Sequence, residues 1–460
     1  MWKRVVITLL AIAVLLFSSV PAAAAGTNQM IGINVLLNTG ITNAILTDLG
    51  MHGTVRDVVY EIRAVTMQVR SGDLAAIQSL PYVMAANPDA TRDGAPVDTV
   101  AVTNFTNGLS TWDLDAINVT DFGPNNRQVT FDGTGVYVAV LDTGLLDSWR
   151  QYFPEQRIAT QYAKAFSGGG GDNGNVSEPT NMWEHDQNSH GTHVASTILG
   201  YSLGGTPING VAPKVTIIPV KVLGQNGSGW SSVIARGIVY VTDLKVSGVL
   251  GNKSVVINMS LGGPGLDSME KAAIDYAIAN GVIIVAAAGN EGTAGMGYPG
   301  AYAPVISVAA SGWVEEWTVS GWWTSNVPDP TNPADYYITD FSSRALPGQD
   351  LDVAAPGSWV VGPYQVNSGQ TSYYYLGGTS MASPHVAGIV ALMVQKNPAL
   401  TAGDAEKILE AAAIYLAPGC RNVNNGIGEI VQYCWGADAT GAGLVTADSA
   451  LKSVPKSKTK

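Results

Sequence analysis

Residues 377–388 read Gly377-Gly378-Thr379-Ser380-Met381-Ala382-Ser383-Pro384-His385-Val386-Ala387-Gly388. Pro384 fits the first turn of a helix, where a missing N–H costs little, and apolar residues follow it at helical spacing. The stretch therefore predicts a tight glycine turn that places Ser380 at a helix N-terminus, where free amides and the helix dipole favour a developing anion. A small-residue helix start without chemistry has the same pattern, so a catalytic role for Ser380 depends on partners elsewhere in the chain.

Short apolar runs alternate with helical stretches from Trp112 onward. The runs cover residues 136–141, 215–222, 255–259, 282–287 and 305–309, with helical patterns at 191–199, 231–241 and 268–280. Continuously apolar strands that alternate with helices are typical of a parallel sheet covered on both faces. The sequence thus predicts an α/β fold with a doubly wound, mostly parallel sheet. Function in such sheets lies beyond the carboxyl ends of the strands, where Asp142 and Asn290 stand.

A histidine and an aspartate complete a set with Ser380. Asp142 ends the first strand, and His190 stands where a helix is expected to open. A lone histidine is most often structural, but the chain order Asp142, His190, Ser380 is that of the subtilisin triad. Five motifs together resemble the subtilase family of serine peptidases, over roughly residues 110 to 450: Leu141–Gly144, His190–Ala195, Ser260–Gly263, Ala287–Gly292 and Gly378–His385.

The resemblance implies a serine endopeptidase that cleaves protein or peptide substrates through an acyl-enzyme. Ser380 would be the nucleophile and His190 the base and then the acid, while Asp142 orients the imidazole and stabilises its cation. The backbone N–H of Ser380 and the side-chain amide of Asn290 would bind the oxyanion. One alternative is an esterase of the α/β-hydrolase fold, which requires Gly-x-Ser-x-Gly and the reverse chain order. Another is a non-catalytic protein that keeps the fold.

The resemblance also implies three groups of substrate-binding residues. An edge that pairs with the peptide backbone, by addition of a β-strand, consists of Ser260, Leu261 and Gly262. The opposite edge consists of Gly227, Ser228 and Gly229, with Trp230 near the P4 side chain. The P1 pocket is lined by Gly289, Asn290 and Gly297, with Glu291 near its mouth, where a carboxylate favours a basic P1 residue.

The first 25 residues read as a secretory signal peptide. Lys3 and Arg4 precede an apolar run, and small residues at 22–25 suit a cleavage site. An uncleaved membrane anchor is the alternative, although the run is short for a span. The protein is therefore expected to be secreted and extracellular, with no membrane contact after signal cleavage. Its net charge of −12 argues against nucleic acid as a partner.

Residues 26–107 are expected to form a small α+β propeptide. Strand, helix, strand, strand, helix and strand are predicted at 31–37, 42–49, 58–62, 65–69, 73–80 and 82–86. This unit resembles the inhibitory propeptide of subtilases, which implies a zymogen inhibited by its own propeptide. A polar stretch at 87–111 without sustained periodicity predicts a linker where maturation cleavage occurs. The peptidase domain then covers 108–451, and 452–460 is a basic tail.

The two cysteines, Cys420 and Cys434, are expected to form a disulfide in a secreted protein, with two free thiols as the alternative. The chemistry requires no cofactor, and no catalytic metal is expected, because the histidines do not follow the HExxH pattern. The chain departs from the family around its main calcium site. The loop at 168–188, with Asp172, leaves room for a structural calcium ion, with a solvated loop as the alternative. A tryptophan-rich insertion at 312–337 is expected to pack on itself.

Overall fold

The computed structural model of the chain describes residues 29–94, 98–101, 110–123, 126–169, 175–367 and 369–457. The expected signal peptide lies before this part of the chain, and Asp172 falls in one of the gaps, so both predictions lie outside the described residues.

The N-terminal unit has the predicted order of strands and helices. Its elements are β1 (Met30–Leu37), α1 (Asn43–His52), β2 (Gly53–Val59), β3 (Ala64–Arg70), α2 (Leu74–Gln78) and β4 (Val83–Pro88). The strands form an antiparallel sheet in the order β2-β3-β1-β4. Alternate residues of β1 and β3 point to one side, so Ile33, Val35 and Met67 are buried in a small core of their own.

Two boundaries in this unit differ from the prediction. Helix α1 continues through Gly50 to His52, because Gly50 lies in open space inside the last turn and the chain turns only at Gly53. The strand predicted at 58–62 instead ends at Val59, and a turn follows in which Arg63 has a φ of 55°.

The main body is built on an eight-stranded sheet, as expected for the α/β class. Its order is β16-β15-β14-β13-β7-β11-β8, and β17 also pairs with β15. Every pairing is parallel except that of β15 with β16. The strands are β7 (Tyr137–Asp142), β8 (Lys164–Ala165), β11 (Thr216–Lys221), β13 (Val255–Met259), β14 (Ile283–Ala287), β15 (Ile306–Trp313), β16 (Tyr336–Ile338) and β17 (Val353–Pro356).

Helices cover both faces of this sheet. Val138 and Val140 of β7 pack in the core that contains α4 (His190–Leu199) and α7 (Thr379–Lys396). Ala139 and Leu141 point the other way, into the core that contains α5 (Ser231–Val246) and α6 (Ser268–Ala279). This two-residue alternation explains why the strands read as continuously apolar: both faces of the sheet are buried.

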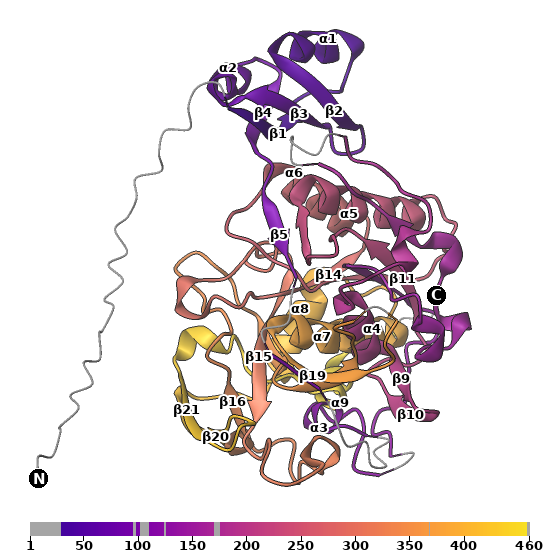
Figure 1. Ribbon diagram of the computed structural model, residues 1–460, viewed down its shortest axis with the longest axis vertical. Coiled ribbons are helices and arrows are strands. Elements are labelled where there is room, and N and C mark those ends of the chain that lie inside the picture. Colours follow the sequence, from indigo (N-terminus) through magenta and orange to yellow (C-terminus); the bar gives the residue numbers. More distant parts are fainter. Residues whose placement is uncertain are drawn as a thin grey trace, which may run out of the picture.

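The N-terminal unit sits on the outer side of α5 and α6 (Figure 1). Asp267, the N-cap of α6, accepts hydrogen bonds from the amides of its own helix and, at 3.1 Å, from Asn34 of β1. Asp89 accepts a hydrogen bond of 3.0 Å from the N–H of Ser232 in the first turn of α5. Carboxylates at helix N-termini are favourable because the first-turn amides lack helical partners. One of the two caps therefore comes from the N-terminal unit itself.

The described residues of the stretch at 87–111, predicted as a linker without sustained periodicity, include two strands that the sequence did not predict. They are β5 (Thr91–Asp93) and β6 (Asp98–Ala101). Each adds to an edge far away in the chain: β5 pairs with β12 (Ser228–Trp230), and β6 pairs with β19 (Tyr373–Gly377). Local sequence carries little signal for such long-range pairing.

The remaining helices and strands surround this frame. They are α3 (Trp112–Ala116), β9 (Gly200–Leu203), β10 (Thr206–Asn209), β18 (Val360–Pro363), α8 (Ala402–Ala412), β20 (Gly419–Asn424), β21 (Ile430–Trp435) and α9 (Ala447–Ser453). Short 3-10 helices lie at Ser71–Asp73, Trp149–Gln151, Glu155–Arg157, Thr160–Tyr162, Met182–Glu184, Gly292–Ala294, Trp322–Thr324, Pro333–Asp335 and Ala437–Ala439. In the part of the chain that the structure describes, no helix combines the length and the apolar composition that a membrane span needs.

Candidate active site

The carboxyl end of β7 meets the N-terminus of α4 in a buried acid–imidazole pair. Nδ1 of His190 lies 2.8 Å and 3.0 Å from the two carboxylate oxygens of Asp142, and both side chains are fully buried. The N–H of Thr143 donates to Asp142 Oδ1 at 2.6 Å, which holds the carboxylate in place. With Nδ1 donating to the carboxylate, Nε2 is the nitrogen that remains for proton transfer.

The turn before His190 is fixed by residues that the sequence analysis did not single out. Ser189 has a φ of 73°, and its N–H donates to Asp186 Oδ2 at 2.8 Å. The same carboxylate oxygen accepts from the hydroxyl of Thr143 at 2.8 Å. Burial raises the pKa of Asp186, while Lys221 acts in the opposite direction. Asp186 thus ties the loop after Asp142 to the loop before His190, although no motif in the sequence marked it.

Gly191 allows α4 to approach the loop after β7 closely. A Cβ at this position would lie 2.4 Å from the carbonyl oxygen of Gly144 and 3.2 Å from the side chain of Asp142. Since the nearest atom is backbone and cannot move aside, any larger residue would push the helix and His190 away from the carboxylate. The glycine therefore sets the geometry of the pair.

Ser380 lies in the first turn of α7, at a helix N-terminus as predicted, but Pro384 lies inside the helix and not in its first turn, because the helix already begins at Thr379. The helix starts after Gly378, whose φ of 156° makes the sharp entry, and Ser380 is only 3% exposed. Its hydroxyl donates to the carbonyl oxygen of Ser260 at 3.2 Å, and Nε2 of His190 has no hydrogen-bond partner in the described part of the chain. A nucleophile–base hydrogen bond is often long or unformed until a substrate binds.

Asn290 is held beside the same helix start. Its Oδ1 accepts from both the N–H and the hydroxyl of Thr379, at 2.9 Å each. These two bonds fix the orientation of the amide, and within the described residues no protein acceptor takes a hydrogen bond from its Nδ2. The amide NH₂ group is therefore available for a ligand next to Ser380.

Two backbone edges flank the site, and a segment of the chain itself lies between them. Strand β5 pairs antiparallel with β12, so that Arg92 faces Gly229. On the other side, Asp93 and Gly262 exchange two backbone hydrogen bonds, of 3.0 and 2.9 Å. The N–H of Gly94 then donates to the carbonyl oxygen of Gly227 at 2.8 Å. Both edges expected to bind a peptide substrate are thus paired with residues 91–94.

A cavity of about 580 Å³ opens beside Ser380. Its lining includes the residues expected for a P1 pocket, namely Gly289, Asn290, Glu291 and Gly297. Glycines at 289 and 297 keep it open, since a Cβ at 289 would lie 2.5 Å from a carboxylate oxygen of Glu291. That oxygen accepts a hydrogen bond of 3.0 Å from Ser343.

All twelve residues predicted for catalysis and substrate binding gather around this one region. Asp142, His190 and Ser380 come from β7, α4 and α7, and Ser260, Leu261, Gly262 and Asn290 follow β13 and β14. The other two histidines of these helices are held by structural contacts. Nε2 of His193 is 3.0 Å from the carbonyl oxygen of Val360, and burial lowers its pKa to about 3. His385 lies between Asp113 and the carbonyl oxygen of Met381.

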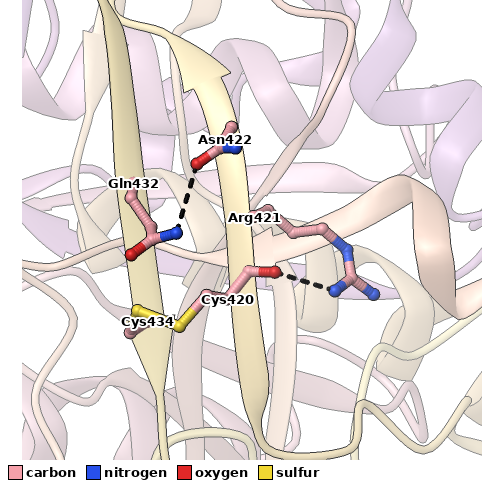
Figure 2. The surroundings of a disulfide bond; sticks show 5 residues. All are labelled: Cys420, Arg421, Asn422, Gln432 and Cys434. Carbon is pink, nitrogen blue, oxygen red and sulfur yellow. Dashed lines mark hydrogen bonds between the residues drawn. A yellow bond between two sulfur atoms is a disulfide. The ribbon is translucent and has the colours of Figure 1, made fainter.

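The predicted disulfide is present between Cys420 and Cys434, which pair across the β20–β21 hairpin (Figure 2). Arg421 donates to the carbonyl oxygen of Cys420, and Gln432 donates to Asn422 on the facing strand (Figure 2). The ring of Tyr433 stacks on Tyr337 of β16 at a centroid distance of 4.9 Å. The hairpin is thus stapled to itself and packed on the edge of the main sheet.

The tryptophan-rich segment packs into the body and not only on itself. Trp313, Trp322 and Trp323 are at most 4% exposed. Trp112 stacks against Trp313 with ring centroids 6.4 Å apart, and Trp322 stacks on Tyr375 at 5.6 Å. The prediction of a self-packed loop is therefore only half right, because Trp112 and Tyr375 come from outside the segment.

An acidic group lies away from the site. Ligand oxygens of Asp350, Asp352 and Glu406 lie within 4.8 Å of one another. Asp352 is 1% exposed, and its Oδ1 has no hydrogen-bond partner among the described residues. Carboxylate oxygens are the ligands that hard cations prefer, so this group could hold a metal ion. No pattern in the sequence marked it, because Glu406 lies more than fifty positions after Asp350 and Asp352.

Comparison with known proteins decides the family. The model of the subtilase family matches residues 133–440. The chain belongs to the subtilase family. This subtilase is 36% identical to subtilisin DY of Bacillus licheniformis over 290 residues, which cover 62% of this chain and 86% of that relative. It is also 36% identical to subtilisin E of Bacillus subtilis over 292 residues, which cover 62% of each protein.

Solved structures agree with this assignment. The crystal structure of fervidolysin from Fervidobacterium pennivorans, described as a keratinolytic enzyme related to subtilisin, superimposes with a TM-score of 0.66 at 25% identity. The match covers 94% of this subtilase, which spans only 62% of the length of fervidolysin. Sphericase gives a TM-score of 0.55 at 29% identity, over 75% of this chain and 99% of that one. The subtilase is thus a subtilisin-like serine endopeptidase that acts on protein substrates.

Proposed function

We propose that this subtilase is a secreted endopeptidase made as an autoprocessed zymogen, and that Asp142, His190 and Ser380 carry out its chemistry. The observation that carries the proposal is the buried contact of His190 with Asp142, 2.8 Å long, at the same sheet edge as the helix that begins at Ser380. The other protein groups that the reaction needs lie around the same helix start.

Acylation would begin when the hydroxyl of Ser380 turns from the carbonyl oxygen of Ser260 to Nε2 of His190. His190 takes the proton as the oxygen attacks the carbonyl carbon, and Asp142 stabilises the imidazolium through Nδ1. The oxyanion receives hydrogen bonds from the N–H of Ser380, free in the first helical turn, and from Nδ2 of Asn290. His190 then gives its proton to the leaving amine, and a water molecule repeats the sequence to release the acid.

The N-terminal unit would act first as a folding partner and then as the inhibitor. Support comes from strand β5, which occupies both substrate-binding edges, and from Asp89, which caps α5 of the main body. Strand β6 pairs with β19, the strand that directly precedes the helix start at Ser380. The described residues 91–94 and 98–101 thus both pair with strands of the main body that border the site. We assign residues 1–25 to the signal peptide, 26–107 to the propeptide, 108–451 to the peptidase domain and 452–460 to the tail.

Replacement of Ser380 tests this function directly. We expect Ser380→Ala to abolish both casein hydrolysis and processing of the precursor, while the exposed Ser453→Ala leaves both unchanged. Retention of either activity in Ser380→Ala would show that the nucleophile is another residue. N-terminal sequencing of the secreted product locates the end of the propeptide.

We also propose that a structural calcium ion binds the acidic group of Asp350, Asp352 and Glu406. The fit rests on the chemistry of three carboxylates and on the buried Oδ1 of Asp352, which has no hydrogen-bond partner in the part of the chain that the structure describes. The ion would offset the repulsion between these carboxylates and would take no part in peptide hydrolysis. Its effect should therefore appear in stability.

A further inference from the structure

Arg92 occupies the place of a defined substrate residue. A Cβ at Gly94 would lie 3.4 Å from Cε1 of His190 and 2.7 Å from the carbonyl oxygen of Ser260, the atom that accepts from the hydroxyl of Ser380. We assign a substrate residue in the position of Gly94 to P2, because it lies against the imidazole of His190 and the carbonyl oxygen that accepts from Ser380. Counting back through Asp93, Arg92 stands at P4, and its backbone pairs with Gly229.

The side chain of Arg92 is fully enclosed and reaches a single carboxylate. Its Nε donates to both oxygens of Glu270 at 3.1 Å, and its Nη2 also donates to Glu270. Neither side chain of the pair is exposed. Two backbone carbonyl oxygens complete the site, with Nη1 donating to Thr91 at 2.8 Å and Nη2 to Gly265 at 3.1 Å.

The pocket is shaped to let a long side chain pass. A Cβ at Gly263 would lie 2.4 Å from the carbonyl oxygen of Thr91 and 3.1 Å from Nη1 of Arg92. The absence of a side chain there leaves the path along which the arginine runs from the cleft to Glu270. Glu270 and Gly265 both belong to the segment that continues from the substrate-binding edge at Gly262 into α6.

Release of the N-terminal unit would remove Arg92 and Asp89 but leave Glu270 and Asp267 on the main body. Burial raises the pKa of Glu270, and Arg92 opposes this rise, whereas Asp267 and Asp89 add to it. The mature pocket would thus hold a carboxylate that has lost its counter-charge, with a second acidic side chain nearby. An incoming cation is the group that such a pocket favours.

We propose that Glu270 makes this endopeptidase select a basic residue, arginine above all, at P4 of its substrates. The inference rests on the proposed function, since it takes the cleft next to Ser380 as the substrate site. Arginine is favoured over lysine because its planar fork meets both carboxylate oxygens and a backbone carbonyl at once, whereas an ammonium is a single point of charge. In the zymogen, Arg92 of the propeptide would fill this pocket in the way that a substrate arginine at P4 does.

The proposal can be tested with the mature enzyme and four fluorogenic peptides that differ only at P4. The four residues are arginine, its neutral analogue citrulline, lysine and leucine. Because a buried hydrogen-bonded charge discriminates strongly, kcat/KM for arginine should exceed that for citrulline and leucine by about tenfold or more, with lysine between them. Glu270→Gln should remove most of this difference. Asp275→Asn, which removes an exposed charge from the same helix, should leave it intact.

A double variant tests the P4 proposal even if Glu270→Gln does not fold. In Arg92→Leu/Glu270→Leu, the zymogen exchanges its buried ion pair for an apolar pair of leucines, and the mature enzyme should favour leucine over arginine at P4. Equal kcat/KM for arginine and leucine with the unchanged enzyme would overturn the P4 proposal while leaving the function intact. Failure of the unchanged enzyme to cleave any of the four peptides, or casein, would instead count against the proposed function.

Discussion

Replacement of Arg92 by alanine should loosen the hold of the N-terminal segment on the cleft. The perturbation is made in the Ser380→Ala precursor, which cannot cleave itself. Arg92 and Glu270 are both fully buried and joined through two guanidinium nitrogens, so the variant leaves an unpaired buried carboxylate. Breaking such a pair costs about 3–5 kcal/mol. Because about 1.4 kcal/mol is a factor of ten, opening of the segment should become more frequent by roughly two to three and a half powers of ten.

Hydrogen exchange measures this opening where it occurs. The N–H groups of Asp93 and Gly94 donate to the carbonyl oxygens of Gly262 and Gly227, so their exchange requires the strand to leave the cleft. Peptides that cover residues 91–94 should lose protection by about the factor given above, while exchange in the core of β1 and β3 changes little. Arg70→Ala, at an exposed position in the same unit, is the matched control.

A small change in exchange at the cleft would contradict the role given to the ion pair. If protection at Asp93 and Gly94 changes by less than about threefold in Arg92→Ala, the ion pair does not hold the segment. The double variant Arg92→Ala/Glu270→Ala should recover part of the protection, because it removes the unpaired carboxylate as well. If the double variant is no better protected than Arg92→Ala, the loss comes from packing and not from the charge.

Four further outcomes are expected. Asn290→Ala should lower kcat by about 10²–10³-fold with little change in KM, the size of effect expected for loss of one oxyanion donor. Steady-state kinetics checks this, and an unchanged kcat would exclude Asn290 as an oxyanion donor. His193 has a folded pKa of about 3, below the unfolded value near 6.5, so the folded state binds fewer protons and stability should fall as pH drops from 6.5 towards 3. Urea unfolding of the Ser380→Ala precursor should show a shallower fall of stability with pH when His193→Gln is added, and equal slopes in the two proteins would contradict this. Cys420→Ser/Cys434→Ser should lose about 3 kcal/mol of stability, since the bridge closes a loop with a sequence separation of 14. In thermal unfolding, reductant should lower the Tm of the unchanged protein but not that of the variant. Calcium should raise the Tm of the precursor and a chelator should lower it, and Asp352→Asn should abolish the response; an equal response in the variant would place any bound ion elsewhere.

Much of the frame was predictable because it depends on local patterns. The apolar strands of the main body and the helix that carries Ser380 each have a short-range signature. The order of the N-terminal unit was predictable for the same reason, although Gly50 did not end α1. Gly50 meets nothing within 4 Å, so a helix tolerates it there at the ordinary cost of a glycine.

The features that were missed depend on contacts between distant parts of the chain. Strand β5 looks like linker because its partners lie at Ser228–Trp230 and Gly262, more than 130 residues away. Glu270 looks like an ordinary helical residue, and only the position of Arg92 shows which way it points. Asp186 and Asp352 are polar residues with no motif around them, and their burial decides their roles. In each case the chemistry of the residue is set by a neighbour that sequence spacing cannot reveal.

The most direct test of the proposed chemistry is to find which atom a serine-directed reagent modifies. A fluorophosphonate should label the mature enzyme at one site per molecule, and peptide mapping by mass spectrometry should place the adduct on Ser380, the proposed nucleophile, which follows the residue that holds the amide of Asn290. Labelling should be lost in Ser380→Ala. An adduct on another serine, or full labelling of Ser380→Ala, would contradict the assignment of the nucleophile.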